Sequence, residues 1–276
     1  MTELRESFES AADGYDAARP AYPEALFDDL VDLARLEPRA RLLEIGCGTG
    51  NATRPLAERG FEILCVELGQ RLAVHARANL EGFPVAIEVS PFENWNGGAG
   101  FDLVYSANAW HWLDPELRFR KAHALLRPNG RLAIWGANHA FPQGFDPFFT
   151  EIQEVYDEIG ECDDGAWPPP PPDEAPDERA AIQASGLFGE VEVRRYLWEL
   201  RYTADEYIAL LDTFSGHLVM KPEARAHLYA EIRRRLGSRE DPSVHRHWSS
   251  ILHVARALPS VANHTCVASN ERRTGL

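Results

Sequence analysis

Residues 42–51 read LLEIGCGTGN, and this short stretch decides the class of fold. Apolar residues interrupted only by Glu44 are typical of a buried strand, and a glycine-rich turn directly after a strand is typical of the start of a βα unit. The turn contains three glycines: Gly46, Gly48 and Gly50. A dinucleotide site has a further glycine or alanine where this chain has Asn51, and Glu44 would repel a pyrophosphate. The stretch therefore predicts a strand, a turn and a helix around a ligand that is not held by phosphate.

A cationic ligand would be favoured by the same carboxylate that repels a phosphate. S-adenosylmethionine carries a sulfonium and an ammonium group, and its small aminoacyl end requires a close approach to the backbone. Glu67 ends the next predicted strand, 17 residues after Gly50, and a carboxylate at that place can accept hydrogen bonds from both ribose hydroxyls. We therefore expect S-adenosylmethionine as the cofactor and S-adenosylhomocysteine as its product. An NAD(P)-dependent oxidoreductase remains the less favoured alternative.

The composition argues against several classes of protein. The chain has 276 residues and a formal net charge of −15, whereas a nucleic-acid-binding protein needs a basic surface that displaces counterions. The four cysteines have neither the spacing of a zinc site nor that of a disulfide framework, which is typical of a reducing compartment: Cys47, Cys65, Cys162 and Cys266. No run of ~18 apolar residues occurs. We expect a cytoplasmic monomer or homodimer that binds no metal, nucleic acid or membrane.

Alternating helix-like and strand-like segments predict an α/β fold. Residues 24–36 place apolar side chains on one helical stripe: Leu26, Phe27, Leu30, Val31 and Ala34. Strands are expected, with helices between them, at residues 41–45, 61–67, 85–90, 101–109 and 131–136. Successive βα units of this length predict a doubly wound, Rossmann-like parallel sheet with helices on both faces.

The pattern changes after residue 140. Residues 162–178 combine acidic side chains with five consecutive prolines and should form an extended, exposed segment. Two helices, at about 203–214 and 222–236, are expected between a strand at about 190–200 and a last strand at 244–258. They predict a helical cap inserted between the last strands, above the ligand-binding edge of the sheet. The expected divisions are 1–38 for N-terminal lid helices, 39–140 for the cofactor-binding core, 141–243 for the cap segment, 244–258 for the last core strand and 259–276 for a flexible tail.

Five motifs in order resemble the class I S-adenosylmethionine-dependent methyltransferases of the small-molecule type. They are LLEIGCGTGN, the acid in CVELG, FENW, FDLVYSANAWHWLDP and LLRPNGRLAI, and the similarity covers residues 40–136. FENW and AWHWLDPE are most similar to the subgroup that contains trans-aconitate methyltransferase. The resemblance implies a seven-stranded sheet whose last strand is antiparallel, with ligands bound at the carboxyl ends of the strands.

The resemblance also implies which residues surround the cofactor. The glycine turn should face the aminoacyl and ribose groups, Glu44 should set the local charge, and Glu67 should hold the ribose. The adenine is expected near Phe92 and Glu93, where Ser90 replaces the usual aspartate of the family. The cofactor-binding residues implied in this way are Glu44, Gly46, Cys47, Gly48, Gly50, Glu67, Leu68, Phe92, Glu93 and Ser106, with Tyr15 and Arg19 on the N-terminal lid.

Methyl transfer by in-line displacement can proceed by positioning and water exclusion, because the sulfur loses its positive charge as the new bond forms. A general base helps only where the acceptor must lose a proton. Three histidines near the predicted carboxyl ends of strands or in the cap are candidates for that role: His111, His139 and His217. The alternative for each of them is a hydrogen-bonded structural group.

The acceptor is expected to be a small molecule, with O-methylation favoured. Aromatic side chains predicted near the site would suit a planar or apolar acceptor: Tyr22, Trp110, Trp112, Trp167, Tyr207 and Phe214. An anionic acceptor would require arginines in the cap, where Arg194, Arg195 and Arg201 are available. A non-catalytic protein that only binds S-adenosylmethionine is the alternative that the sequence leaves open.

Overall fold

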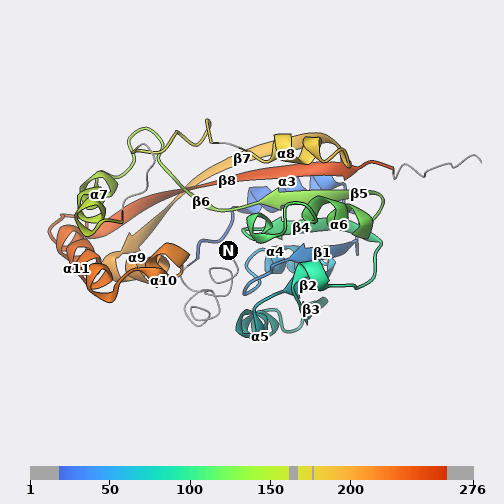
Figure 1. Cartoon of the computed structure of the whole chain (residues 1–276), viewed down its shortest axis with the longest axis horizontal. Helices are drawn as coiled ribbons and strands as arrows, with labels where there is room; N and C mark the ends of the chain where they lie inside the picture. The colour runs from blue at the N-terminus through green and yellow to red at the C-terminus, as the bar shows by residue number, and fades with distance from the viewer. Residues whose placement is uncertain (1–18, 162–166, 176, 260–276) are drawn as a thin grey trace, which may run out of the picture.

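The fold is built on a mostly parallel sheet of eight strands (Figure 1). The structure is a computed structural model, and it describes residues 19–161, 167–175 and 177–259. The strands are β1 (Arg41–Ile45), β2 (Glu62–Glu67), β3 (Val85–Val89), β4 (Phe101–Ala107), β5 (Leu126–Trp135), β6 (Asn138–Ala140), β7 (Phe188–Thr203) and β8 (Ser243–Ala257). The first five pair in parallel in the order β3-β2-β1-β4-β5, whereas β8 runs antiparallel to β5, β6 and β7. The predicted α/β class of fold and the antiparallel last strand are confirmed.

Helices cover both faces of the sheet because the central parallel strands carry apolar side chains on both of their faces. On β1, Leu42 packs in the hydrophobic core that includes α3, and Leu43 packs in the core that includes α6. The apolar stripe expected for residues 24–36 is buried at Leu26 and Leu30. The helices are α3 (Glu24–Ala34), α4 (Thr53–Glu58), α5 (Gln70–Asn79), α6 (Arg118–Leu125), α7 (Phe148–Ile159), α8 (Arg179–Ala184), α9 (Ala204–Leu211), α10 (Ser215–Val219) and α11 (Pro222–Gly237).

The sheet has one strand more than the seven expected, because the chain leaves the ladder between β5 and β6. The N–H of Ala137 donates to Oδ1 of Asn108 at 2.9 Å instead of to a neighbouring strand. On the same edge of β8, β5 pairs from Arg131 to Ile134 and β6 pairs from Asn138 to Ala140. β5 and β6 therefore occupy one position in the sheet, and the order of the remaining strands is kept.

Beyond the core, β7 and β8 continue as a two-stranded ribbon that forms one wall of the segment predicted to be a cap, at the left of Figure 1. Their pairing reaches from Phe188 and Ala257 at one end to Thr203 and Ser243 at the other. Helices α7, α9 and α11 pack on this ribbon around a separate hydrophobic cluster. Of the cap helices, α9 and α11 correspond to the two that the sequence predicts, and α10 is an additional short helix between them. The sequence did not predict α7 and α8, which precede β7.

Local sequence sets the ends of the cap helices. Thr203 and Glu206 form a capping box, in which Glu206 N donates to Thr203 Oγ1 at 3.3 Å and Thr203 N donates to the Glu206 carboxylate at 2.8 Å. α7 ends at Gly160, which has a φ of 74°. Pro222 begins α11. The first N–H groups of a helix have no acceptor within the helix, so the missing N–H of proline costs no hydrogen bond there.

The proline run, residues 168–172, contains neither helix nor strand. It lies against β7, where Arg195 Nη1 donates to the carbonyl oxygens of Pro172 at 3.2 Å and Ala175 at 3.3 Å. Within the three described ranges, no helix has both the length and the apolar character needed to cross a membrane. Residues 1–18 of the predicted lid, which include Tyr15, and residues 260–276 of the predicted tail lie outside the described residues.

Candidate functional site

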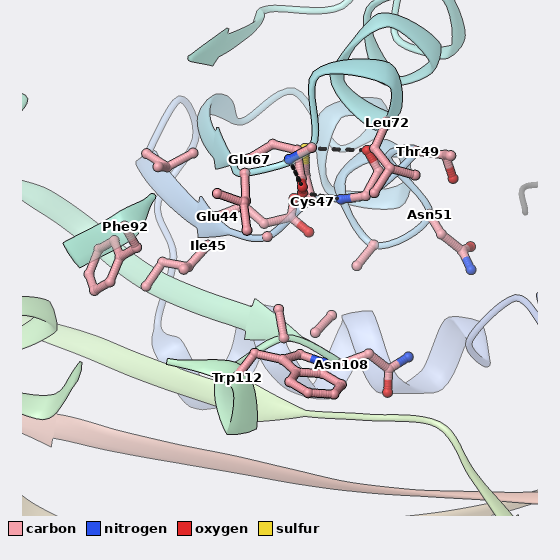
Figure 2. Close-up of a pocket in the computed structure, with 18 of the residues that line it drawn as sticks. Glu44, Ile45, Cys47, Thr49, Asn51, Glu67, Leu72, Phe92, Asn108 and Trp112 are labelled. Carbon is pink, nitrogen blue, oxygen red and sulfur yellow. Dashed lines mark hydrogen bonds between the residues drawn. The ribbon is translucent and has the colours of Figure 1, made fainter. Parts of the chain in front are cut away.

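A cavity of about 380 Å³ opens at the carboxyl ends of β1, β2 and β4. Figure 2 shows Glu44, Cys47 and Glu67 on one side of it, with Asn108 and Trp112 opposite. In an open α/β sheet, ligands bind outside the carboxyl ends of the strands. The place of this cavity agrees with the site predicted from the glycine turn.

Gly46 makes the sharp turn after β1 possible. Its φ is +72°, and a Cβ at this position would lie 2.5 Å from the Cβ of Ala109. Its N–H donates to the carbonyl oxygen of Val66 at 2.8 Å, which holds the turn against β2. A side chain here would strain the backbone and push the turn away from the loop after β4. Gly50 does not line the cavity; a Cβ on it would lie 2.9 Å from Cδ1 of Leu80, at the end of α5.

Glu67 ends β2 with a carboxylate that two backbone N–H groups hold in place. Gly48 N donates to Oε2 and Gly69 N donates to Oε1, both at 2.8 Å. The side chain is 5% exposed and lines the cavity (Figure 2). Each oxygen of an ionised carboxylate can accept two hydrogen bonds. The two N–H groups therefore orient both oxygens, and a carboxylate oriented in this way matches a ligand with two adjacent hydroxyls.

Glu44 also lines the cavity, but the residue is only 1% exposed. Its Oε2 accepts hydrogen bonds from Thr53 Oγ1 at 2.6 Å and from the Tyr105 hydroxyl at 2.7 Å. Its Oε1 has no hydrogen-bond partner among the described residues. Burial raises the pKa of Glu44 to about 7, and the negative charge of Glu67 acts in the same direction. Burial therefore favours the protonated form of Glu44 in the absence of a cationic ligand.

The segment before α3 closes one side of the cavity. Asn51 Nδ2 donates to the carbonyl oxygen of Pro20 at 2.9 Å, and Asn108 Nδ2 donates to the hydroxyl of Tyr22 at 2.7 Å. Pro20, Tyr22 and both asparagines line the cavity. Asn51, the residue that breaks the dinucleotide pattern, thus joins the glycine turn to the N-terminal segment.

The predicted cofactor residues that line the cavity are Arg19, Glu44, Gly46, Cys47, Gly48, Glu67, Leu68 and Phe92. Ser90, which replaces the aspartate of the family, lines it as well. Besides Gly50, two other predicted residues do not line it. The Oε1 of Glu93 accepts the N–H of Asp114 at 3.3 Å, outside the cavity. Ser106 is fully buried and donates to the carbonyl oxygen of Ile45 at 3.0 Å, so it joins β4 to β1 instead of facing a ligand.

The aromatic residues predicted to bind the acceptor lie in several places. Tyr22 and Trp112 line the cavity. Trp110 is 2% exposed and does not, because the short 3₁₀ turn of residues 110–112 directs its ring into the core against α6. Trp167 is 40% exposed, and its ring centroid lies 4.8 Å from that of Phe141 in the cap.

Phe214 lies directly before α10, and its ring contacts two guanidinium groups. Its ring centroid is 4.4 Å from Cζ of Arg19 and 5.4 Å from Cζ of Arg246. Arg19 also donates from Nη2 to the carbonyl oxygen of Thr213 at 2.8 Å. Because Arg19 lines the cavity too, these contacts join the cavity to the cap.

The three candidate histidines lie outside the residues that line the cavity. His111 is exposed, with its ring centroid 4.8 Å from that of Trp112. His139 lies on β6 and His217 on α10, and burial and then the charge of Arg246 lower their pKa to about 2 and about 4. A general base works best when its pKa is near the working pH. His139 and His217 are therefore uncharged at neutral pH, and both are weak bases.

From the sequence, residues 106–109 are expected to face the methionine part of the cofactor through backbone carbonyls, and the role of the Asn108 side chain was missed. Asn108 has a φ of 60°, a conformation that asparagine adopts more readily than most other residues with a side chain. Both ends of its amide group are used, since Nδ2 donates to Tyr22 and Oδ1 accepts from Ala137. An asparagine directly after a parallel strand is the signal that could have singled it out.

The three arginines considered for an anionic acceptor are exposed on β7 and pair with nearby acids. The pairs are Arg194 with Glu192 at 3.9 Å, Arg195 with Asp177 at 3.4 Å and Arg201 with Asp241 at 3.6 Å. Their charge is therefore directed to the surface. In the part of the chain that the structure describes, no three His, Cys, Asp or Glu side chains gather as ligands of a metal ion.

Comparisons with known proteins agree with this geometry. Residues 42–130 match a family described as a methyltransferase domain. An uncharacterised methyltransferase of Mycobacterium tuberculosis (strain H37Rv) is 35% identical over 128 residues, which are 46% of this chain and 51% of that protein. The trans-aconitate 2-methyltransferase of Deinococcus radiodurans is 34% identical over 114 residues, which are 40% and 43% of the two chains. The chain spans about half the length of the curated relatives it matches.

Solved structures extend the similarity beyond the glycine turn and the first strands. A candidate type II methyltransferase from Anaeromyxobacter dehalogenans aligns with a TM-score of 0.60 at 25% identity, over 86% of this chain and 97% of the other. A candidate methyltransferase from an antibiotic biosynthesis pathway of Anabaena variabilis aligns with a TM-score of 0.57 at 15% identity, over 83% and 96% of the two chains. The second similarity shows the fold alone.

Proposed function

We propose that this chain, whose residues 42–130 belong to the class I S-adenosylmethionine-dependent methyltransferases, transfers a methyl group from S-adenosylmethionine to a small-molecule acceptor. The observation that carries the proposal is the carboxylate of Glu67, which lines the cavity at the end of β2 with each oxygen held by a backbone N–H. A ribose diol that leaves water on binding would regain charge-assisted hydrogen bonds at such a carboxylate.

The residues around the cavity fit S-adenosylmethionine in several respects. Glu67 suits the ribose hydroxyls, Gly46 lets the backbone approach an aminoacyl group, and the buried ring of Phe92 offers an apolar surface to adenine. Glu44 has an Oε1 without a partner among the described residues, which suits an ammonium group. The cavity volume of about 380 Å³ falls within the range of about 300–1,000 Å³ that is usual for small-molecule sites.

When bound, S-adenosylmethionine supplies an electrophilic methyl group on a positively charged sulfur. The residues of the chain have to hold the acceptor in line with that methyl group and keep water out. Asn108 and Trp112 are placed for this role, because they line the wall opposite Glu67 (Figure 2). Tyr22 supports it by its hydrogen bond to Asn108, which keeps the N-terminal segment at the cavity.

O-methylation is the reaction that we favour. The similarity to a trans-aconitate 2-methyltransferase supports a small organic acceptor with oxygen atoms. A carboxylate oxygen is already deprotonated at neutral pH, so its methylation needs no general base. This chemistry agrees with the positions of His139 and His217, which lie outside the cavity lining and are weak bases.

Calorimetric titration with S-adenosylhomocysteine, NAD and NADP tests the cofactor. We expect S-adenosylhomocysteine to bind with a Kd in the micromolar range, about −8 kcal/mol, and both dinucleotides to bind much more weakly. Tighter binding of NAD would contradict the proposal. A methyl-release assay with trans-aconitate and a panel of hydroxy, carboxy and amino metabolites then tests turnover. Cofactor binding without turnover on any of them would favour a non-catalytic binding module.

A further inference from the structure

Arg246 is a buried arginine without an acidic partner. It lies on β8, is 4% exposed, and forms no ion pair with a carboxylate of the described residues. Its Nε has no hydrogen-bond partner there, and the bond from Nη1 to the hydroxyl of Tyr207 is long, at 3.5 Å. Burying a guanidinium costs free energy unless an opposite charge and hydrogen-bond acceptors compensate. The described part of the chain supplies neither in full.

Aromatic rings compensate only part of this cost. Cζ of Arg246 lies 4.3 Å from the ring centroid of Trp248, 5.4 Å from that of Phe214 and 5.7 Å from that of Tyr207. Such cation–π contacts stabilise the charge. They do not satisfy the N–H groups, because the five donors of a guanidinium lie in its plane and require acceptors.

Two histidines near Arg246 also carry buried nitrogens without a partner among the described residues: His139 Nε2 and His217 Nδ1. His139 is paired with Trp248 across β6 and β8, and Trp248 packs against Arg246. His217 uses its Nε2 for a 2.9 Å hydrogen bond with the hydroxyl of Tyr156. Buried polar atoms without partners are uncommon in native proteins. Three of them around one positive charge point to a ligand that supplies oxygen atoms.

This group of residues adjoins the cofactor cavity. We define the Arg246 cluster as Arg246, Tyr207, Phe214, His139 and His217. The ring of Phe214 contacts both Arg246 and Arg19, and Arg19 lines the cavity. Arg19 therefore connects the two places and adds a second positive charge beside the cluster. An anion bound at Arg246 would lie on the side of the cavity that Arg19 lines.

We propose that the Arg246 cluster binds a carboxylate group of the methyl acceptor, so that the acceptor is an organic acid. The inference rests on the proposed methyl transfer and specifies the acceptor class for it. A guanidinium and a carboxylate match as a pair of parallel hydrogen bonds. The neutral histidines can each donate one N–H to the same anion, and the rings of Phe214 and Tyr207 suit the apolar body of the acid.

The test separates the acceptor from the cofactor, since S-adenosylmethionine has a carboxylate of its own. Protein saturated with S-adenosylhomocysteine is titrated with succinate, trans-aconitate, benzoate and phenylacetate, each compared with its primary amide. We expect at least one acid to bind roughly tenfold more tightly than its amide. Equal binding of every acid and its amide, or binding of none, would overturn this inference while cofactor binding stood. Preference for an acid by protein that does not bind S-adenosylhomocysteine would overturn the methyltransferase proposal and retain the anion site.

Arg246→Met removes the charge and keeps much of the side-chain volume. It should abolish the preference for the acid and change S-adenosylhomocysteine affinity less than about twofold. Arg239→Met is the matched control, because Arg239 already pairs with Asp146 at 3.1 Å, and it should keep the preference. If Arg246→Met still preferred the acid over its amide, or if Arg239→Met lost that preference to the same extent, Arg246 would have a structural role only. Should Arg246→Met not fold, Arg246→Lys retains the charge without the planar fork and should bind the acid more weakly than the wild type.

Discussion

Asn108 donates from Nδ2 to the hydroxyl oxygen of Tyr22 at 2.7 Å, and the Oδ1 of the same side chain accepts the N–H of Ala137 at 2.9 Å. One amide group thus joins the N-terminal segment, the loop after β4 and the break between β5 and β6. These parts meet at the wall of the cavity opposite Glu67 (Figure 2). Ligand binding should therefore depend on Asn108 through the position of Tyr22 as well as through direct contact.

Asn108→Gly keeps the backbone conformation and removes both hydrogen bonds. We expect the affinity for S-adenosylhomocysteine to fall roughly tenfold, or about 1.4 kcal/mol, by calorimetry. Tyr22→Phe removes only the hydroxyl and should produce a smaller loss. If both variants bound S-adenosylhomocysteine like the wild type, the N-terminal segment would have no part in cofactor binding.

Glu67→Gln removes the charge and keeps one acceptor oxygen. The affinity for S-adenosylhomocysteine should fall by roughly 1.5–3 kcal/mol, because hydrogen bonds to a charged acceptor are lost. Glu67→Ala should in addition lower the free energy of unfolding by roughly 1–3 kcal/mol, since the N–H groups of Gly48 and Gly69 lose their acceptors. Urea denaturation measures the second effect. Unchanged affinity in Glu67→Gln would remove the main support for the proposed function.

Glu44→Gln tests the pH dependence of stability. Burial raises the pKa of Glu44 from 4.5 to about 7 in the folded protein, so between these values the unfolded chain has released a proton that the folded chain retains. Raising the pH through this window therefore favours the unfolded state, by up to about 3 kcal/mol. The wild type should lose stability relative to Glu44→Gln between pH 4.5 and pH 7, measured by urea denaturation. A constant difference across this range would show that the carboxyl group does not keep its proton.

Gly46→Ala should prevent cofactor binding. The left-handed conformation costs a residue with a Cβ roughly 1–2 kcal/mol, and the contact with Ala109 adds to this. Gly216→Ala is a suitable control, because a Cβ there has no atom within 4 Å. Calorimetry with S-adenosylhomocysteine should show no binding to the first variant and wild-type binding to the second. Normal binding by Gly46→Ala would mean that the glycine turn can accommodate a Cβ at this position without loss of cofactor affinity.

Phe214→Ala, His217→Ala and Trp167→Ala test whether the cap contacts the acceptor. Each should change the acceptor KM or kcat, while the affinity for S-adenosylhomocysteine changes less than about twofold. Cofactor calorimetry, melting temperature and turnover are measured on each variant. A lowered melting temperature with normal acceptor kinetics would indicate that these side chains only pack the cap together.

The parallel core could be predicted from sequence because its signals are local. The apolar run that holds Leu42 and Leu43 marks a strand buried on both faces, and the glycines directly after it mark the turn. The break between β5 and β6 has no such signal. It depends on Asn108, which is 29 residues from Ala137 in sequence and accepts its N–H. Contacts of this kind exist only after the strands have come together.

Some residues of the site likewise have a local sequence signal, and others do not. Glu67 could be predicted from its place at the end of a strand, whereas its two N–H donors, Gly48 and Gly69, appear only in the folded chain. Arg246 could not be distinguished from Arg194 by sequence, since both lie on strands of the same ribbon. What distinguishes them is the carboxylate beside Arg194 and the lack of one beside Arg246 among the described residues.

Arg246 lies on strand β8, whereas Tyr207 and Phe214, which pack against it, lie on α9 and directly before α10. The same strand pairs with the core through His253 and Ile134, so the proposed anion anchor is continuous with the core of the fold. Replacing residues 204–237 by the corresponding helices of another methyltransferase would exchange Tyr207, Phe214 and His217 of the Arg246 cluster and leave Arg246 and His139 in place. Such a hybrid should accept acids of a different shape, yet still acids. In the proposed arrangement, Arg246 would select the acceptor by its charge and the cap helices would select it by its shape.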